Sequence, residues 1–372
     1  MTAASRNGER SATPRVSIWQ SGWFNSLGRF VALLVVFAFF ALMVEGGKFY
    51  SPRNLESILR QSAVYATAAL GMTLVIIAGG IDLSVGSIIA LTVVVVAWVL
   101  NLSTGGTGED ATGDVQYLIY EYPLMLPIAA VLAGVATAAL AGAVNGCLIV
   151  GLRLVPFIVT LGTLGIWRGL AKGITGQRDI YPPESTWLSD IMDPTLIPFL
   201  DWMKGERAAA PRGIEWSIFP VGVWILIVAS ALAALLLRYT RFGRHVFAIG
   251  SNESTARLCG VPVERTKVVV YMLAGFFAGL AGLMQFSYEG GNGYPTTALG
   301  YELHVIAAVV LGGGSLLGGE GSILGSVIGA LMITILKMGG EQMDWPKWVQ
   351  EAVIGGIIIA AATLDHIRHR GQ

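Results

Sequence analysis

Residues 71–91, GMTLVIIAGGIDLSVGSIIAL, form an apolar segment that is interrupted in its middle. The first apolar run reaches Gly79 and Gly80, polar residues including Asp82 and Ser84 follow, and the apolar run then resumes. In the hydrocarbon core of a membrane every backbone N–H and C=O group must be hydrogen-bonded within the protein. A break of this kind therefore survives only inside protein or beside a water-filled cavity.

A second interruption of the same kind lies in the other half of the chain. The apolar run at 305–311 is followed by GGGSLLGG at 312–319, and an apolar run resumes at 322–333. Glycine-broken apolar segments in the two halves of a transporter mark its substrate path. We therefore predict that a translocation path is lined at the two breaks by Gly79, Gly80, Asp82, Ser84, Gly313, Gly314 and Ser315.

The composition indicates a membrane protein with several spans. Of the 372 residues, 54% are hydrophobic and 13% are charged, whereas soluble domains carry about 25% charged residues. The mean hydropathy is +0.66. A span needs about 20 apolar residues, and fewer when it is re-entrant. The sequence predicts an all-α fold with ten spans, at 28–46, 62–79, 84–101, 124–150, 155–175, 217–237, 267–287, 302–317, 321–338 and 350–366.

Charged residues in the loops predict the orientation, because basic residues concentrate on the cytoplasmic side. Segment 238–267 has six basic residues against two acidic ones. Segment 101–123 has four acidic residues and no basic one, and segment 175–215 has seven acidic residues against four basic ones. We expect 238–267 to be cytosolic and the other two segments to be external loops.

The same orientation places both termini in the cytosol. Residues 1–29 and 367–372 then form cytosolic tails around a membrane domain at 30–366. The first apolar run follows a long polar segment and precedes no A-x-A cleavage site, which favours a retained span over a signal peptide. Segment 47–61 disagrees with this orientation, since it should be external yet carries Lys48, Arg53 and Arg60.

Two further patterns concern packing. Small residues four positions apart let helix backbones approach closely in lipid, and one such series is Gly134, Ala138, Gly142 and Gly146. Arg168 and Lys172 interrupt the predicted span 155–175, and we expect both side chains to extend toward a membrane interface.

The chain shows no signature of an enzyme. It has no G-x-x-x-x-G-K-[ST] phosphate loop, no H-E-x-x-H motif and no cluster of cysteine and histidine. The two cysteines, Cys147 and Cys259, are isolated and form no disulfide framework or metal site. The net charge of zero does not suggest nucleic acid as a partner. We predict a non-catalytic chain that binds no cofactor of its own.

Asp82 is open to two interpretations. Its carboxylate can cap the helix at 84–101 by accepting backbone N–H groups, with Ser84 as a rival cap. Alternatively it binds a substrate or a proton, because ionisable groups within a membrane are functional candidates. The position immediately before a resumed helix favours the cap.

Other polar residues in the apolar segments also have two interpretations. Asn145, Thr160 and Thr163 can hydrogen-bond between helices, or they can line a low-affinity path for a polyol. Glu302 and His304 can lie at the external interface, where they are solvated, or serve a proton-coupled transporter as a pair. The interface is favoured for Glu302 and His304.

The predicted cytosolic segment contains a short capped helix. Asn252 or Ser251 can cap a helix from Glu253 to Leu258, and Gly260 marks the turn after it. A short helix across one end of a bundle is well shaped to enter a groove of a partner protein. The alternative is a solvated connector.

These motifs together resemble a known family. The matching stretches are GMTLVIIAGGIDLSVGS, NGCLIV at 145–150, PFIVTLGT at 156–163, FAIGSNESTARLCGV at 247–261, GYEL at 300–303 and AAVVLGGGSLLGGEGSILGSVIGAL at 307–331. They resemble the inner-membrane permeases of ABC importers for ribose, xylose, arabinose and galactose, which are related to branched-chain amino acid permeases. The resemblance extends from about residue 50 to the C-terminus.

The resemblance implies an assembly. It implies a type II-like ABC importer architecture, with two permease subunits, alike or different, on ATPase subunits that use ATP and Mg²⁺, and a periplasmic sugar-binding protein. It also implies that the ATPase docks on a coupling helix that contains Asn252, Glu253, Ala256, Arg257 and Gly260. Relatives often have Glu-Ala-Ala where this chain has Glu253-Ser254-Thr255, and Asp at the position of His304.

We therefore expect a multi-pass permease subunit of the bacterial inner membrane that imports a monosaccharide by alternating access. One alternative is an ion-coupled secondary transporter, which would depend on Asp82 or Glu302. A passive channel is another. An ABC permease for a nucleoside or a branched-chain amino acid is the third. Only the ABC permeases require the coupling helix.

Overall fold

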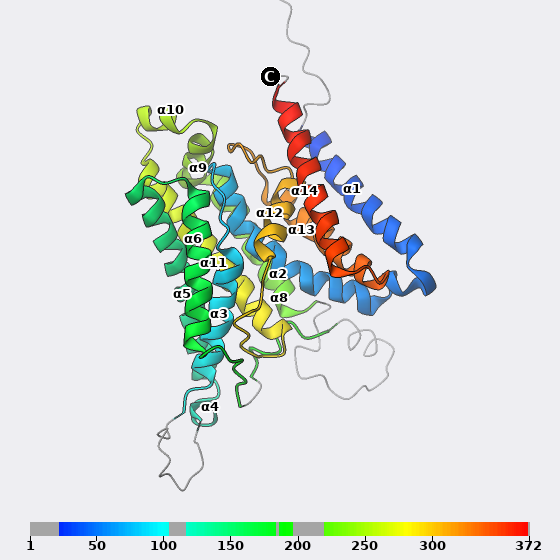
Figure 1. Cartoon of the computed structure of the whole chain (residues 1–372). Coiled ribbons are helices and arrows are strands. Elements are labelled where there is room, and N and C mark those ends of the chain that lie inside the picture. The colour runs from blue at the N-terminus through cyan, green and yellow to red at the C-terminus, as the bar shows by residue number, and fades with distance from the viewer. Residues whose placement is uncertain (1–21, 104–116, 184–185, 196–218, 371–372) are drawn as a thin grey trace, which may run out of the picture.

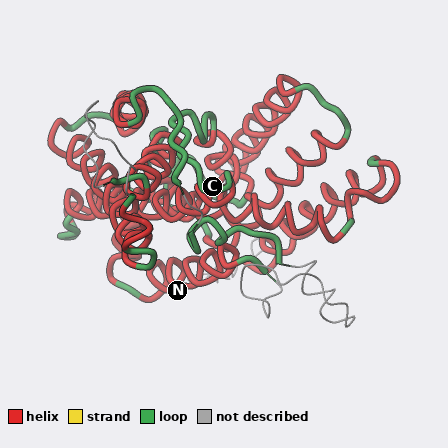
Figure 2. Tube along the Cα trace, turned by 90° about the horizontal axis from the view of Figure 1, so that it is seen from below, coloured by secondary structure: helices red, strands yellow, loops and turns green. Residues whose placement is uncertain are grey.

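The computed structural model describes residues 22–103, 117–183, 186–195 and 219–370. Within these ranges every regular element is a helix (Figure 2), and strand pairing is limited to two isolated bridges, Ser103–Tyr117 and Ile180–Gly293. The all-α class is therefore confirmed for the part of the chain that is described. Most of the tail 1–29, and parts of the predicted loops 101–123 and 175–215, lie outside the described residues.

Within the described residues the chain forms fourteen helical elements, which Figure 1 labels where there is room. They are α1 (Gly22–Met43), η2 (Glu45–Tyr50), α2 (Pro52–Ile77), α3 (Val85–Leu100), α4 (Leu118–Glu121), α5 (Met125–Leu152), α6 (Pro156–Ile174), α8 (Val221–Tyr239), α9 (Arg241–Ser251), α10 (Glu253–Leu258), α11 (Val263–Tyr288), α12 (Tyr301–Leu311), α13 (Ile323–Gln342) and α14 (Lys347–Arg370). We refer to the end of the bundle with α9 and α10 as the α10 end, and to the opposite end as the α4 end (Figure 1).

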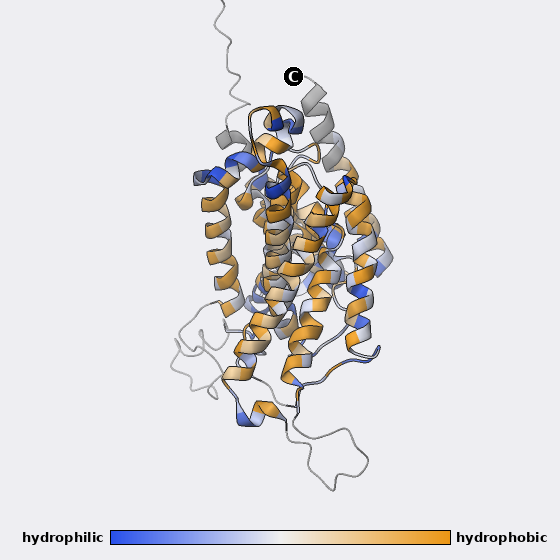
Figure 3. Ribbon diagram, turned by 90° about the vertical axis from the view of Figure 1, so that its left-hand side faces the viewer, coloured by the Kyte–Doolittle hydropathy of each residue, from blue (hydrophilic) through white to orange (hydrophobic). Residues whose placement is uncertain are grey.

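Each of the ten predicted spans overlaps one described α-helix, but the number of membrane crossings stays a prediction. By length and hydropathy, 5 described helices can cross a membrane: α2, α5, α8, α11 and α13. Shorter apolar helices lie at Leu27–Met43, Val85–Leu100 and Tyr301–Leu311. Figure 3 shows apolar residues along the length of the bundle and polar residues concentrated toward its two ends.

Helix α2 begins earlier than the sequence predicted. It starts at Pro52, so Arg53 and Arg60 belong to a helix rather than to the external loop expected at 47–61. Proline suits the first helical position because it has no N–H to leave unsatisfied. The guanidinium of Arg60 lies 5.3 Å from the centre of the Tyr288 ring, a cation–π contact. Arg53 and Arg60 therefore do not belong in a count of loop charges, and of the three basic residues only Lys48 still disagrees with the predicted orientation.

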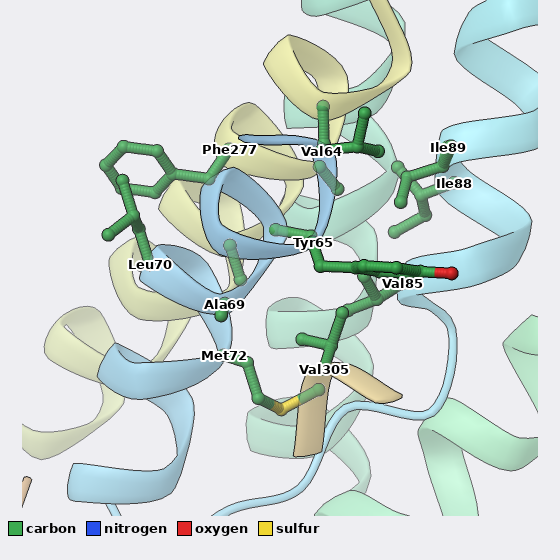
Figure 4. Close-up of a cluster of buried hydrophobic side chains, with 14 of the residues drawn as sticks. Val64, Tyr65, Ala69, Leu70, Met72, Val85, Ile88, Ile89, Phe277 and Val305 are labelled. Atoms are coloured by element: carbon green, nitrogen blue, oxygen red, sulfur yellow. The ribbon is translucent and has the colours of Figure 1, made fainter. Parts of the chain in front are cut away.

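The same helix forms the centre of the fold. From Gln61 to Ile77 it is buried on all sides, and it packs against α8, α11, α12 and α13. A helix that is apolar all round is an internal helix. Figure 4 shows Val64, Tyr65 and Leu70 of α2 among apolar side chains of neighbouring helices, including Val85, Phe277 and Val305.

Helices α5 and α11 pack backbone to backbone, as the small-residue series predicted. A Cβ atom added at Gly142 would overlap the carbonyl oxygen of Tyr271 and lie 3.0 Å from the Cα of Gly275. One added at Gly146 would lie 2.7 Å from the Cα of Val268. Only glycine permits this approach, which supplies dispersion contacts where no hydrophobic force drives association.

Two helices begin inside the bundle. Helix α3 follows a non-helical segment at 78–84, and α12 follows a second one at 289–300. Figure 1 shows the first turns of both helices near the middle of the bundle. A Cβ added at Gly86 would lie 2.5 Å from the Ala298 oxygen and from Glu302 Oε2, so the two helix starts meet.

This arrangement corrects the predicted second break. The span expected at 302–317 ends at Leu311, and 312–319 is a turn at the α10 end. The segment that enters the bundle is instead 289–300, which the sequence did not single out.

Arg168 stabilises this entering segment, and the expectation that it extends to an interface is wrong. Its side chain is buried, and its guanidinium donates to the carbonyl oxygens of Pro295 at 3.1 Å and Thr297 at 2.5 Å. Buried carbonyl groups outside a helix need donors, and a guanidinium carries five of them. Lys172, one turn further along α6, is exposed, and its extension toward a membrane interface stays a prediction.

The close approach of α5 and α11 predicts a stability difference between two glycines of one helix. Gly142→Val should lower the free energy of unfolding by about 1–3 kcal/mol or more, because the added atoms overpack the interface. Gly151→Val is the matched control, since nothing lies within 4 Å of a Cβ added there. Thermal unfolding of both variants in detergent measures the difference. Equal midpoints would contradict the packing described.

Candidate translocation and coupling site

Three backbone segments from different parts of the chain meet at the α10 end. The Gly319 N–H donates to the carbonyl oxygen of Ile77 at 2.9 Å. A Cβ added at Gly250, in the last turn of α9, would overlap that oxygen and lie 2.5 Å from the Gly319 nitrogen. A Cβ added at Gly318 would lie 3.0 Å from the Cα of Gly79. We refer to Ile77, Gly79, Gly250, Gly318 and Gly319 as the glycine junction.

Backbone conformation explains why glycine occupies the two breaks. Gly79 has φ +78°, Gly313 +84°, Gly318 +91° and Gly319 +77°, values that cost other residues energy. The two predicted breaks thus lie side by side, joined through the glycine junction.

The polar residues of the first break form a network with α5. The Asp82 side chain is fully buried, and its Oδ1 accepts hydrogen bonds from the backbone N–H of Ser84 at 2.8 Å and from its hydroxyl at 2.6 Å. Asn145 donates to the same hydroxyl oxygen at 2.7 Å. The cap interpretation is confirmed in part, because Asp82 accepts the N–H of Ser84, the first residue of the helix expected at 84–101, whereas the rival cap Ser84 makes no capping hydrogen bond through its own side chain.

Helix α6 completes this network. The indole N–H of Trp167 donates to Asn145 Oδ1 at 3.3 Å, and the Thr160 hydroxyl lies 3.2 Å from the Ile81 carbonyl oxygen. Thr163 is buried one turn further along. The sequence had singled out Asp82, Ser84, Asn145, Thr160 and Thr163, and the structure brings them together. The sequence analysis did not identify Trp167. The only indication that this residue could join a polar network is its indole N–H group within an apolar helix.

Tyr271 of α11 lies against the first break and was also missed. A Cβ added at Gly80 would lie 2.5 Å from its hydroxyl oxygen. That hydroxyl and Asp82 Oδ2 are both buried, and neither has a hydrogen-bond partner among the described residues. Buried polar atoms of this kind are commonly bridged by water.

The residues predicted at the second break form a separate group. Ser315 is buried, its N–H donates to the Glu320 oxygen at 3.2 Å, and its carbonyl oxygen accepts from Gly318 at 3.0 Å. A Cβ added at Gly314 would lie 2.6 Å from a methyl group of Val309. Gly313, Gly314 and Ser315 therefore close a tight turn, which contacts the first break through Gly318 and Gly319.

Glu302 and His304 are half-buried against neighbouring helices, so they are not the freely solvated pair that the sequence favoured. The carboxylate of Glu302 packs beside Gly86 at the start of α3. The His304 ring stacks on Tyr65 of α2 with 5.4 Å between ring centres, and its Nδ1 lies 3.0 Å from the Gly300 oxygen.

The short helix in segment 248–267 is confirmed as α10. Asn252 is its N-cap, and its side-chain oxygen accepts from the Thr255 N–H at 2.9 Å. Ala256 is buried beneath the helix with Ile249 and Val263. Gly260, with φ +80°, ends the helix in a left-handed turn.

The outer face of α10 carries a network of ion pairs and an exposed apolar side chain. Glu253 contacts Lys267 at 2.7 Å and Arg257 at 3.3 Å, and Arg257 also pairs with Glu264. The hydrogen bond from Lys267 holds the pKa of Glu253 below its ordinary value. Leu258 is 89% exposed at the end of the helix. These ion pairs hold the charged side chains on the outer face of α10 together.

The site offers no metal centre within the part of the chain that is described. No group of three or more His, Cys, Asp and Glu side chains is placed to hold an ion there. Cys147 and Cys259 are free and exposed.

Comparisons with known proteins agree with the resemblance seen in the motifs. Residues 54–362 match the family described as the permease component of branched-chain amino acid transport systems. The ribose import permease protein of Escherichia coli strain K12 is 35% identical over 92% of this chain and 94% of its own. The xylose transport system permease protein of Haemophilus influenzae is 33% identical, over 90% and 94%.

The D-allose transport system permease protein of Escherichia coli strain K12 is 30% identical over 93% of both chains. No solved structure matches the chain. The family match covers most of the chain, and the relatives align over nearly their whole length. The chain therefore belongs to the family of membrane permease components that carries out branched-chain amino acid and sugar transport.

Proposed function

We propose that the chain is the permease subunit of an ATP-driven ABC importer that carries a monosaccharide across the bacterial inner membrane. The observation that carries this proposal is the match along more than nine-tenths of the chain to a permease named for ribose import, with permeases named for xylose and D-allose close behind. The match extends along the chain and is not confined to one motif, so the aligned region includes both breaks and α10.

The chemistry of the first break supports a path for an uncharged polar solute. Its network contains hydroxyl and amide groups of Ser84, Asn145 and Thr160, which are fully buried here and would exchange hydrogen bonds with a polyol when alternating access exposes them. The path would run beside both breaks, between this subunit and a second permease, alike or different. Weak neutral contacts suffice when a separate periplasmic binding protein supplies the affinity.

The proposed orientation places the α10 end in the cytosol. Segment 238–267, both chain termini and α10 would then face the ATPase, and segments 101–123 and 175–215 would face the binding protein. ATP and Mg²⁺ would bind the ATPase subunits, and this chain would be non-catalytic. Asn252, Glu253, Arg257 and Gly260 would form the ATPase contact, and the buried Ala256, also expected there, would instead hold α10 against the bundle. Alternating access would follow from movements transmitted through α10.

One observation favours an ion-coupled secondary transporter instead. Asp82 is a fully buried carboxyl group with one unpartnered oxygen among the described residues, and such groups take part in proton transfer in transporters. The two functions differ in what they require of Asp82 and α10.

The first prediction concerns α10. Glu253→Lys should reduce both ATPase co-purification and uptake of radiolabelled ribose, xylose or D-allose by about tenfold or more, because a reversed charge opposes docking. Uptake is measured in cells that express the matching ATPase and binding protein. Glu121→Lys, a charge reversal at the α4 end, is the control and should leave ATPase co-purification unchanged.

A charge swap separates docking from folding. Glu253→Lys combined with Lys267→Glu restores an ion pair across the 2.7 Å contact but leaves the outer face of α10 changed. We expect the double variant to stay uncoupled from the ATPase. Recovery of uptake would show that Glu253 only holds α10 in place, and would contradict the docking role.

The second prediction concerns Asp82. Asp82→Asn keeps a side-chain oxygen that can accept the Ser84 N–H, so ATP-driven uptake should stay within about threefold of the wild type, a cost of under 1 kcal/mol. Uptake should also persist when a protonophore collapses the proton gradient and ATP is maintained. Loss of uptake in Asp82→Asn, together with protonophore sensitivity, would favour the secondary transporter.

A further inference from the structure

The glycine junction joins α10 to both breaks without an intervening side chain. Gly250 is followed by Ser251 and by Asn252, the N-cap of α10. Its Cα lies so close to the Ile77 oxygen and the Gly319 nitrogen that no Cβ fits between them. The end of α9, the end of α2 and the turn before α13 are thus in direct backbone contact.

Such a contact is stiffer than an ordinary helix interface. Side chains between helices can change rotamer and absorb a displacement, whereas backbone atoms in van der Waals contact cannot. The Gly319–Ile77 hydrogen bond adds a directional link between the two breaks. A displacement of α10 must therefore reach Ile77 and Gly319 together.

The contact continues from Ile77 to the polar network. The chain passes from Ile77 through Gly79 and Gly80 to Ile81, whose carbonyl oxygen meets Thr160 of α6. Three residues further on, Ser84 meets Asn145 of α5. Between Ile81 and Ser84 the backbone is not helical, so these contacts determine its path.

We propose that Gly250 is a positioning residue for coupled transport, and that the glycine junction moves as one unit and transmits displacement of α10 to both interrupted segments. This inference rests on the proposed function, because it takes α10 to be the ATPase contact. Gly250 acts through Ile77 and Gly319 and does not contact the solute.

The proposal is tested by the substitution Gly250→Ala, which adds a single methyl group at the junction. Gly250 lies within α9 and has an ordinary helical φ, so Gly250→Ala changes the contact without straining the local backbone. The added Cβ would force Ile77 and Gly319 away from α9. Gly356→Ala in α14 is the matched control, because it adds the same atom where nothing lies within 4 Å.

Both variants are purified with the ATPase, placed in liposomes and supplied with the binding protein and with whichever of ribose, xylose and D-allose the wild type imports. We expect Gly250→Ala to bind the ATPase and to hydrolyse ATP as the wild type does. The number of sugar molecules moved per ATP should fall about tenfold, a factor within the usual range for energetic coupling between two sites. Gly356→Ala should match the wild type in all three measurements. Unchanged sugar moved per ATP in Gly250→Ala would overturn the proposal.

A second measurement does not depend on the folding of Gly250→Ala. Ser251 and the exposed Leu317 line one cavity of about 320 Å³ beside the junction. Ser251→Cys and Leu317→Cys, in a chain with Cys147→Ser and Cys259→Ser, can be joined by a short reducible thiol cross-linker. If the junction moves as one unit, uptake with the cross-link should stay within about twofold of uptake after reduction. Uptake that is lost on cross-linking and regained on reduction would overturn the proposal.

Failure of the proposed function is visible separately. If the wild-type protein takes up sugar without the ATPase, the proposed function is wrong, and the proposal for the glycine junction falls with it. Failure of the junction alone would appear only in the comparison of Gly250→Ala with wild type, or of cross-linked with reduced protein.

Discussion

The structure depends on one constraint: a helix that is interrupted inside an apolar bundle must find hydrogen-bond partners for its freed backbone groups. Each interruption solves this differently. The Ile77 oxygen accepts from Gly319, the Ser84 N–H donates to Asp82, and the carbonyl groups at 295–298 accept from Arg168. In the first and third cases the partner comes from another segment. In the second, Asp82 lies two residues from Ser84, and the Ser84 hydroxyl in turn accepts from Asn145 of α5. Closing a break therefore fastens it to the rest of the fold, and the polar residues of the site are largely the ones that close the breaks.

The same constraint explains how the bundle accommodates charge. Arg168 directs its guanidinium to backbone carbonyl groups, and Glu56 of α2 accepts the Thr195 N–H at 2.5 Å. Both residues serve as donors or acceptors for the backbone rather than as binding sites. What remains at the first break is chiefly hydroxyl and amide groups, apart from Asp82 and the Glu302 carboxylate beside Gly86. This suits a solute without charge better than an amino acid, whose ammonium and carboxylate would need opposite charges to replace water.

The sequence predicted what local patterns determine. Glycine pairs followed by Asp82 identified the first break, a capping Asn252 identified α10, and small residues predicted a close helix contact for α5, although not that its partner is α11. It did not predict what depends on tertiary contacts. The role of Arg168 depends on a segment more than a hundred residues away, and Tyr271 and Trp167 are ordinary aromatic residues until the fold places them at the break. The segment 289–300 was not singled out, because glycine, proline and threonine give no sign of whether a turn lies outside the bundle or enters it.

The first break connects two kinds of contact. At its beginning, Ile77 and Gly79 contact other backbone segments, with no side chain between them. At its end, Ile81 and Ser84 contact α5 and α6 through hydrogen bonds of side chains. Because the residues between lack helical hydrogen bonds, their path is determined by what is fastened at each end. A shift at the glycine junction must therefore change the positions of Ile81 and Ser84 relative to α5 and α6. A continuous helix would instead have moved as a rigid rod and carried its whole apolar surface with it, at the cost of repacking the core around α2.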